Sequence, residues 1–225
     1  MNWVKSQILS KISGVVHGFS NRGFNGSLSE AAGLFGLRGI ATLDQIHSSR
    51  VFVIRNKFKG LEQKGDALIA DLKGIGVGVF TADCMPILLV DDSTSVVAAI
   101  HAGWRGTLSQ IAKATILEIE KGFGIAPSRI HAVLGPSIGV CCYEIGWDVA
   151  SLFMDRFSDW EGYLLRKGKS EYVLDLKEAN RYALAREGVK NIEIIEICTK
   201  CNMEFHSYRR DGKRTGSHIN FIGLI

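Results

Sequence analysis

Two apolar runs joined by a short polar segment constrain the fold more than any other part of this sequence. Residues 87–90 (ILLV) and 96–100 (VVAAI) flank a segment, DDSTS, whose composition is typical of a hairpin loop. If the loop is centred just before Ser93, Cys84 and His101 are equidistant from its centre. Opposed residues of an antiparallel pair have Cβ atoms about 4.5–5.5 Å apart, whereas a slip of one residue turns one partner to the other face. The hairpin therefore predicts that a thiol and an imidazole meet at its open end.

Elsewhere the hydrophobic pattern changes from strand-like to helical along the chain. The pattern predicts a helix from Thr107 to about residue 119, opened by a Thr107-x-x-Gln110 capping box. It predicts two more helices, one over residues 147–157 and one that begins after Asp175 and stops near Gly188. Strands are predicted at residues 14–19, 51–54, 67–70, 75–81, 87–90, 96–101, 192–197 and 218–222. This order indicates an α+β fold in a single domain, residues 1–225, with a mixed β-sheet core and flanking helices.

Composition and charge exclude several classes of protein. With 46% apolar and 22% charged residues the chain is that of a globular protein, and no apolar run approaches the roughly 18 residues of a membrane span. The N-terminus has no signal-peptide pattern, so we expect a cytoplasmic protein without a membrane partner. A net charge of +4 is too small for a nucleic-acid binder but permits attraction of phosphate. Gly74, Gly76 and Gly78 lie within an apolar strand with no following helix, which indicates close packing rather than dinucleotide binding.

The surroundings of Cys84 and His101 indicate a metal site. His101 enters the loop His-Ala-Gly-Trp-Arg-Gly, which leads toward a predicted helix N-terminus, and Arg105 lies beside that anion-attracting position. Catalytic zinc usually has three protein ligands, and His47 is our choice for the third. The other histidines are His17, His131, His206 and His218.

The remaining cysteines form two short motifs. Cys198-x-x-Cys201 has the spacing of half a zinc knuckle or of a redox pair, but Cys141-Cys142 lacks the usual spacing of a second ligand pair. We therefore expect these four side chains to be core or loop thiols.

Taken together, the motifs resemble those of the laccase-domain, or multicopper polyphenol oxidase, family over nearly the whole chain. The motifs that carry the resemblance are His17-Gly-Phe-Ser, Gln45-x-His47, Gly65-Asp-Ala67, Thr81-Ala-Asp-Cys84-x-Pro-Ile-Leu-Leu, His101-Ala-Gly-Trp-Arg-Gly-Thr107, Gly135-Pro-Ser-Ile, Cys142-Tyr-Glu144, Leu174-Asp-Leu176, Cys198-Thr199 and Ser207-Tyr-Arg-Arg-Asp-Gly212.

The resemblance implies a purine nucleoside phosphorylase that uses phosphate and acts on adenosine, inosine and S-methyl-5′-thioadenosine, with an adenosine deaminase activity. It implies zinc, with copper as the alternative metal, bound by two histidines and a cysteine, which fall at His47, Cys84 and His101. The fold it implies resembles that of a cytotoxic deamidase toxin with a Cys/His site. Phosphate would be held by basic side chains, for which the candidates are Arg50, Arg105, Arg209 and Arg210.

Three other functions remain open from the sequence. A Cys/His amidase, for example one that edits peptidoglycan precursors, would use Cys84 as nucleophile and His101 as base, oriented by Asp83 or another carboxylate. A polyphenol oxidase with several coppers is disfavoured, because the six histidines include no His-x-His pair. A partner-docking protein would use the basic run 209–214, although such runs are usually solvated faces.

Overall fold

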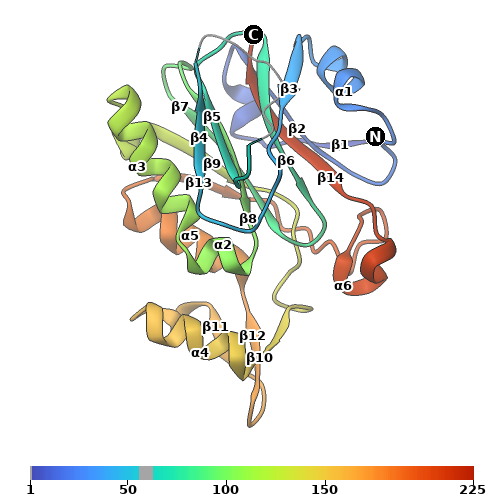
Figure 1. The fold of residues 1–225 in the computed structure, drawn as a ribbon, viewed down its shortest axis with the longest axis vertical. Coiled ribbons are helices and arrows are strands. Elements are labelled where there is room, and N and C mark those ends of the chain that lie inside the picture. Colours follow the sequence, from blue (N-terminus) through green and yellow to red (C-terminus); the bar gives the residue numbers. More distant parts are fainter. Residues whose placement is uncertain (1, 56–62) are drawn as a thin grey trace.

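A six-stranded mixed sheet forms the centre of the molecule (Figure 1). The computed structural model describes residues 2–55 and 63–225. In this sheet β4 runs parallel to β5 and β13 parallel to β9, while the other neighbours are antiparallel. Its strands, in spatial order, are β13 (Asn191–Ile194), β9 (Ile130–Leu134), β7 (Met85–Asp91), β8 (Val97–Ala102), β5 (Ala67–Ala70) and β4 (Val51–Ile54).

A second, five-stranded sheet stacks on one face of the first. Its strands, in spatial order, are β1 (Trp3–Val4), β2 (Val15–Ser20), β14 (His218–Leu224), β6 (Ile75–Thr81) and β3 (Gly39–Ala41). Only β3 and β6 are parallel neighbours within this sheet. Helix α1 (Leu28–Leu34) covers its outer face, as Figure 1 shows, and packs Ala31 and Ala32 near Phe221.

The period of two along β7 explains why both faces of the central sheet are buried. Leu88 and Val90 point into the core between the two sheets, whereas Ile87 and Leu89 point toward the helices. Those helices cover the face of the central sheet that is opposite the five-stranded sheet (Figure 1). They are α2 (Trp104–Leu108), α3 (Ile111–Phe123) and α5 (Leu176–Arg186).

A small third sheet with helix α4 (Trp147–Arg156) lies at one end of the molecule (Figure 1). Its strands are β10 (Glu144–Gly146), β12 (Glu171–Leu174) and β11 (Leu164–Arg166). The last helix, α6 (Tyr208–Asp211), precedes β14. Short 3₁₀ turns complete the described chain at η1 (Leu9–Lys11), η2 (Pro127–Arg129), η3 (Trp160–Gly162) and η4 (Gly212–Arg214).

The glycines of β6 serve close packing, as the sequence predicts. A Cβ at Gly76 would lie 2.9 Å from Leu37 Cδ1, and one at Gly78 would lie 3.0 Å from both Ile40 and Ile219. Real Cβ atoms rarely approach so closely, so β6 carries glycine where side chains of its two neighbours in the sheet, β3 with the segment before it and β14, lie against it.

The mixed-sheet architecture is confirmed, and every predicted strand overlaps an observed one. The predicted helices over 147–157 and after Asp175 are also confirmed, with Asp175 accepting from Lys177 N and Glu178 N. The predicted start at Thr107 is wrong. Helix α2 begins at Trp104, and α3 begins separately at Ile111 because Gln110 adopts the left-handed conformation with φ 60°. In the described part of the chain, no helix is both long and apolar enough to cross a membrane.

Candidate active site with a Cys/His metal centre

The β7–β8 hairpin places Cys84 differently from the predicted register. The observed register pairs Pro86 with His101 and Met85 with Ala102, two residues away from the prediction. Cys84 lies just before β7, at the level of Gly103. Because the slip is an even number of residues, it keeps side chains on the predicted face, and Cys84 and His101 still come together. Gly103 makes room for this arrangement, since a Cβ there would lie 2.8 Å from Cys84 Sγ.

Three side chains meet at the open end of the hairpin. His47, from the segment between β3 and β4, joins Cys84 and His101, and their potential ligand atoms all lie within 4.8 Å of one another. His47 Nε2 is 4.0 Å from Cys84 Sγ, and the two imidazole rings are nearly perpendicular with centroids 4.7 Å apart. One thiol and two imidazoles form a donor set that suits zinc and also copper.

A buried carboxylate, Asp66, orients two of these groups. It lies immediately before β5 and has no exposed surface. One oxygen is 2.9 Å from both His101 Nδ1 and the backbone N–H of His47, while the other accepts from Ser48 N at 2.6 Å and Ser48 Oγ at 2.7 Å. With His101 Nδ1 bound in this way, Nε2 is the nitrogen left for a metal. These contacts also hold His47 in the left-handed conformation, with φ 58°.

Hydrogen bonds and neighbouring charges shift the pKa of Asp66, His101 and Cys84. Burial raises the pKa of Asp66, but hydrogen bonds from His101 and Ser48 outweigh it and lower the pKa to about 2. Burial lowers the pKa of His101, but Asp66 and Cys84 raise it to about 9. Burial also raises the pKa of Cys84, which His101 and His47 bring down to about 7. The cluster therefore favours thiolate, and a bound cation would replace the His101 proton.

Asp66 is a functional residue that was not predicted from the sequence. The signal was present in the Gly65-Asp66-Ala67 motif, which places a carboxylate at the entrance of an apolar strand. A buried carboxylate needs several donors, so such a position predicts a hydrogen-bonded partner.

Asp83, next to Cys84, does not orient His101, the role considered for it in an amidase. Its carboxylate accepts from Thr199 Oγ1 at 2.6 Å, from Ser207 Oγ at 3.0 Å and from Arg209 N at 2.6 Å. It thus ties the C-terminal loops to the turn that carries Cys84, while Asp66 is the carboxylate that orients His101. Asp83 has φ 84°, a strained conformation that these three hydrogen bonds help to maintain.

A cavity of about 620 Å³ opens beside the three ligands. Its wall combines aromatic side chains with two cationic ones, Arg105 and Arg209. Arg209 Nη1 donates to the carbonyl of Glu144 at 2.9 Å. The lining residues are Gln45, His47, Phe80, Thr81, Ala82, Asp83, Cys84, His101, Trp104, Arg105, Ile138, Tyr143, Leu176, Tyr208, Arg209 and Ser217.

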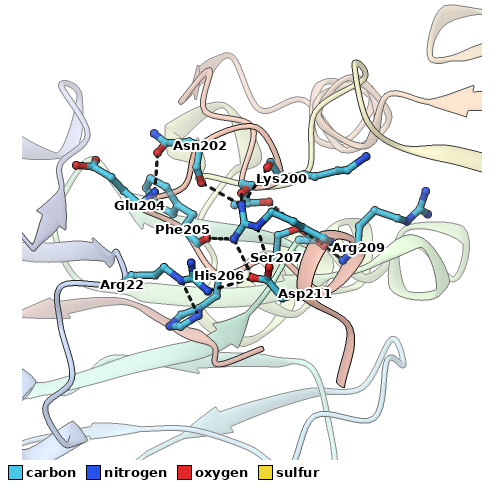
Figure 2. Close-up of polar contacts among 12 residues, drawn as sticks. Arg22, Lys200, Asn202, Glu204, Phe205, His206, Ser207, Arg209 and Asp211 are labelled. Atoms are coloured by element: carbon cyan, nitrogen blue, oxygen red, sulfur yellow. Dashed lines mark hydrogen bonds and ion pairs between the residues drawn. The ribbon is translucent and has the colours of Figure 1, made fainter. Parts of the chain in front are cut away.

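The other two candidate arginines lie outside this lining. Arg50 is exposed just before β4, and its carbonyl accepts the N–H groups of Asp66 and Ala67. The guanidinium of Arg210 donates to the carbonyls of Thr199, Lys200 and Phe205 and to the Asp211 carboxylate. Of these acceptors, Figure 2 labels Lys200, Phe205 and Asp211. Arg210 therefore organises the C-terminal loop instead of facing the cavity.

The other four cysteines are free thiols in loops, as expected, but they are not spread apart. Their sulfur atoms form a second group, within 4.8 Å of one another, which the sequence spacing did not predict. Adjacent cysteines were rejected as a ligand pair because of their spacing, whereas the fold brings them to the Cys198-x-x-Cys201 turn from another loop.

Comparison with known proteins agrees with the motifs. A purine nucleoside phosphorylase from Clostridium acetobutylicum is 39% identical over 190 residues, which cover 84% of this chain and 78% of the relative. An adenosine deaminase from an unknown prokaryotic organism is 41% identical, covering 80% of this chain and 72% of the relative. The crystal structure of YlmD from Geobacillus stearothermophilus superimposes with a TM-score of 0.88 at 28% identity. The superposition covers all of this chain and 96% of the YlmD chain. The Bacillus licheniformis hypothetical protein YfiH gives 0.89, also at 28% identity, with 96% and 94% covered. A family profile matches residues 25–225, and the chain belongs to the multi-copper polyphenol oxidoreductase laccase family.

Proposed function

We propose that this protein is a cytoplasmic, zinc-dependent purine nucleoside phosphorylase that acts on adenosine, inosine and S-methyl-5′-thioadenosine, with an adenosine deaminase activity. One observation carries the proposal: the His47–Cys84–His101 group opens onto a cavity that also contains aromatic rings and two arginines. Relatives named as purine nucleoside phosphorylases and as an adenosine deaminase support it.

The residues present fit a zinc ion. Thiolate and imidazole are preferred zinc ligands, and three protein ligands leave one position for water or substrate, as in catalytic sites. The Asp66–His101 contact is the carboxylate–histidine pair that commonly supports a metal ligand. A zinc ion bound there would supply a Lewis acid that polarises a substrate oxygen or lowers the pKa of a bound water.

The cavity residues provide the other functions of a phosphorylase. Phe80, Trp104 and Tyr143 offer aromatic surface for a purine, and Arg105 and Arg209 offer guanidinium groups for phosphate. In phosphorolysis a phosphate oxygen bonds to ribose C1′ while the bond from C1′ to the purine nitrogen breaks. The purine leaves with the bonding electrons and takes up a proton, which gives the free base and ribose 1-phosphate. In deamination, water replaces the amino group at C6 and ammonia leaves.

Turnover of inosine with and without phosphate tests the proposal. We expect hypoxanthine and ribose 1-phosphate to form only when phosphate is present, and adenosine to release ammonia without it. The Cys84→Ala and His101→Ala variants should lose at least about 100-fold in kcat/KM. His131→Ala is the matched control, because His131 lies on β9 outside the cavity lining. Equal rates of base release with and without phosphate would show that the enzyme hydrolyses the nucleoside and would contradict phosphorolysis.

A second candidate, the Cys/His amidase, is favoured by one specific observation. Cys84, His101 and Asp66 have the order of contacts of a nucleophile, a base and an orienting carboxylate, and the pKa of Cys84 is lowered to about 7. The resemblance to deamidase toxins also belongs to this proposal. Zinc that is retained through purification and is required for turnover contradicts it, whereas full amide hydrolysis by metal-free protein supports it.

Multicopper oxidation has less support. Among residues 2–55 and 63–225, His47–Cys84–His101 is the single group of three metal-ligating side chains that contains histidine. A trinuclear copper cluster requires many more histidines, so copper binding at this centre would give at most a mononuclear site.

A further inference from the structure

The second cysteine group lies where two loops leave adjacent parallel strands. Strand β9 pairs in parallel with β13, so the C-terminal ends of both strands lie at the same end of the sheet. The loops continue side by side, since Ser137 and Cys198 form a further parallel bridge and Thr199 N donates to Ser137 O at 3.0 Å. One loop carries Cys141 and Cys142, and the other carries Cys198 and Cys201.

Tight turns bring the four sulfur atoms together. The N–H of Cys142 donates to Gly139 O at 2.9 Å in the first loop, and Asn202 N donates to Cys198 O at 3.0 Å in the second. Cys201 Sγ lies 3.6 Å from Cys141 Sγ and 3.3 Å from Cys142 Sγ. All four sulfur atoms lie within 4.8 Å of one another.

These distances match one metal ion held by four thiolates. Zinc binds thiolate at about 2.3 Å, so the edge of a regular ZnS₄ tetrahedron is about 3.8 Å, within the observed range. In an iron–sulfur cluster the four thiolates bind to two or four different iron atoms, so the four cysteine sulfur atoms lie further apart than around a single ion. Two disulfides would satisfy the sulfurs in pairs and would not require all four to be mutual neighbours.

The backbone around the group is also that of a thiolate–metal site. The N–H of Gly139 donates to Cys198 Sγ at 3.2 Å, the kind of outer contact that stabilises a metal-bound thiolate. A Cβ at Gly139 would lie 3.1 Å from Cys198 Cβ, so glycine permits this approach. Lys200 lies between Cys198 and Cys201 in the sequence, and Arg210 Nη1 donates to the Lys200 carbonyl at 3.0 Å, which helps to fix the second loop.

We propose that Cys141, Cys142, Cys198 and Cys201 bind a structural zinc ion that joins these two loops, separate from the His47–Cys84–His101 centre. Binding of Zn²⁺ displaces the four thiol protons to solvent and involves no redox step. Cys141 and Cys201 are exposed and Cys142 and Cys198 are partly buried, so solvent zinc can reach the four sulfur atoms.

The position of this ion gives it a role in the catalytic cavity. The first loop continues from Ile138 to Tyr143, which both line the cavity, and Ile138 N donates to the carbonyl of Asp83. The second loop supplies Thr199, which binds the Asp83 carboxylate. The zinc ion would therefore act as a positioning element for the wall beside Cys84.

Zinc content measured on the intact protein tests the proposal. We expect about two zinc ions per chain in wild type by native mass spectrometry and elemental analysis. The His47→Ala/Cys84→Ala variant should keep one, and the Cys142→Ser/Cys201→Ser variant should also keep one. Cobalt added to metal-free His47→Ala/Cys84→Ala protein should give the visible bands and thiolate charge-transfer absorption of tetrahedral cobalt.

The outcomes separate this proposal from the proposed function. Loss of all zinc from the His47→Ala/Cys84→Ala variant, in a chain that keeps the wild-type circular dichroism spectrum, would overturn the structural site whatever the activity. A denatured, unreduced mass lower by two hydrogen atoms per bond would show disulfides and would also overturn it. Because the active-site variant retains all four cysteines, the test does not depend on whether the cysteine variants fold.

Discussion

Replacement of Asp66 by asparagine tests the role of the buried carboxylate most directly. The carboxylate accepts four hydrogen bonds through two oxygens, whereas an amide has one oxygen. If the amide nitrogen faces Ser48, the Ser48 backbone N–H loses its acceptor. If the nitrogen faces His101, it donates to Nδ1 and forces the ring proton onto Nε2, the nitrogen that a metal needs. Both orientations weaken the centre.

The expected magnitudes follow from these contacts. Loss of an outer-shell partner of a ligating histidine lowers metal affinity by about 10–100-fold. An unpaired buried N–H together with lost charged hydrogen bonds lowers the free energy of unfolding by about 2–3 kcal/mol. Competition with a chromogenic chelator measures the affinity, and urea unfolding of the metal-free proteins measures the stability.

Asp92→Asn is the matched control for this substitution. Asp92 makes an ion pair with Arg129 at the surface, with 45% of its side chain exposed, so the same chemical change should alter the urea midpoint little and leave zinc binding unchanged. Zinc affinity of Asp66→Asn within twofold of wild type, with an unchanged urea midpoint, would refute the reasoning that Asp66 orients His101.

Three further predictions concern packing, acid stability and phosphate. Gly103→Ala places a Cβ 2.8 Å from Cys84 Sγ and should lower zinc affinity at least about tenfold, because displaced ligands bind poorly. Gly33→Ala is the control, because a Cβ at Gly33 has no atom within 4 Å. Equal zinc affinities of the two variants would contradict the steric argument. The buried histidines His17 and His218 have pKa values lowered to about 4, mainly by burial. Their contribution to the free energy of unfolding is therefore fully present above pH 6.5 and falls by about 3 kcal/mol for each histidine as the pH drops toward 4. Urea unfolding between pH 7 and 4 should show this loss, and a free energy of unfolding that does not change with pH would disprove it. Arg209→Ala should raise the KM for phosphate about tenfold with zinc content unchanged, measured by steady-state phosphorolysis, and an unchanged KM would remove this residue from phosphate binding.

The sequence predicted the strands well because their apolar runs are buried on both faces, as in β5 and β7. It predicted the hairpin register less well, because the loop composition defines a turn but not its centre. The observed pairing of Pro86 with His101 differs by two residues from the symmetric estimate. The break at Gln110 was missed for a related reason, since helical periodicity continues through a single left-handed residue.

Convergence of distant residues was harder to predict than the strands. His47 was chosen over the four other remaining histidines, but its own surroundings in the sequence gave that choice little support until the family motifs were added. Asp66 and Thr199 act through side-chain contacts that only the assembled sheets create. The second cysteine group was missed because its two halves lie about sixty residues apart and meet through the parallel pairing of β9 with β13.

The Asp83 carboxylate gives the centre a dependence on the order in which the chain is made. Its three donors come from Thr199, Ser207 and Arg209, more than a hundred positions later in the sequence. During synthesis the hairpin that carries Cys84 emerges well before these donors, so the strained turn at Asp83 lacks its anchors until residues 199–209 have left the ribosome. The turn that carries Cys84 therefore reaches its final geometry only after the C-terminal segment has folded onto the hairpin.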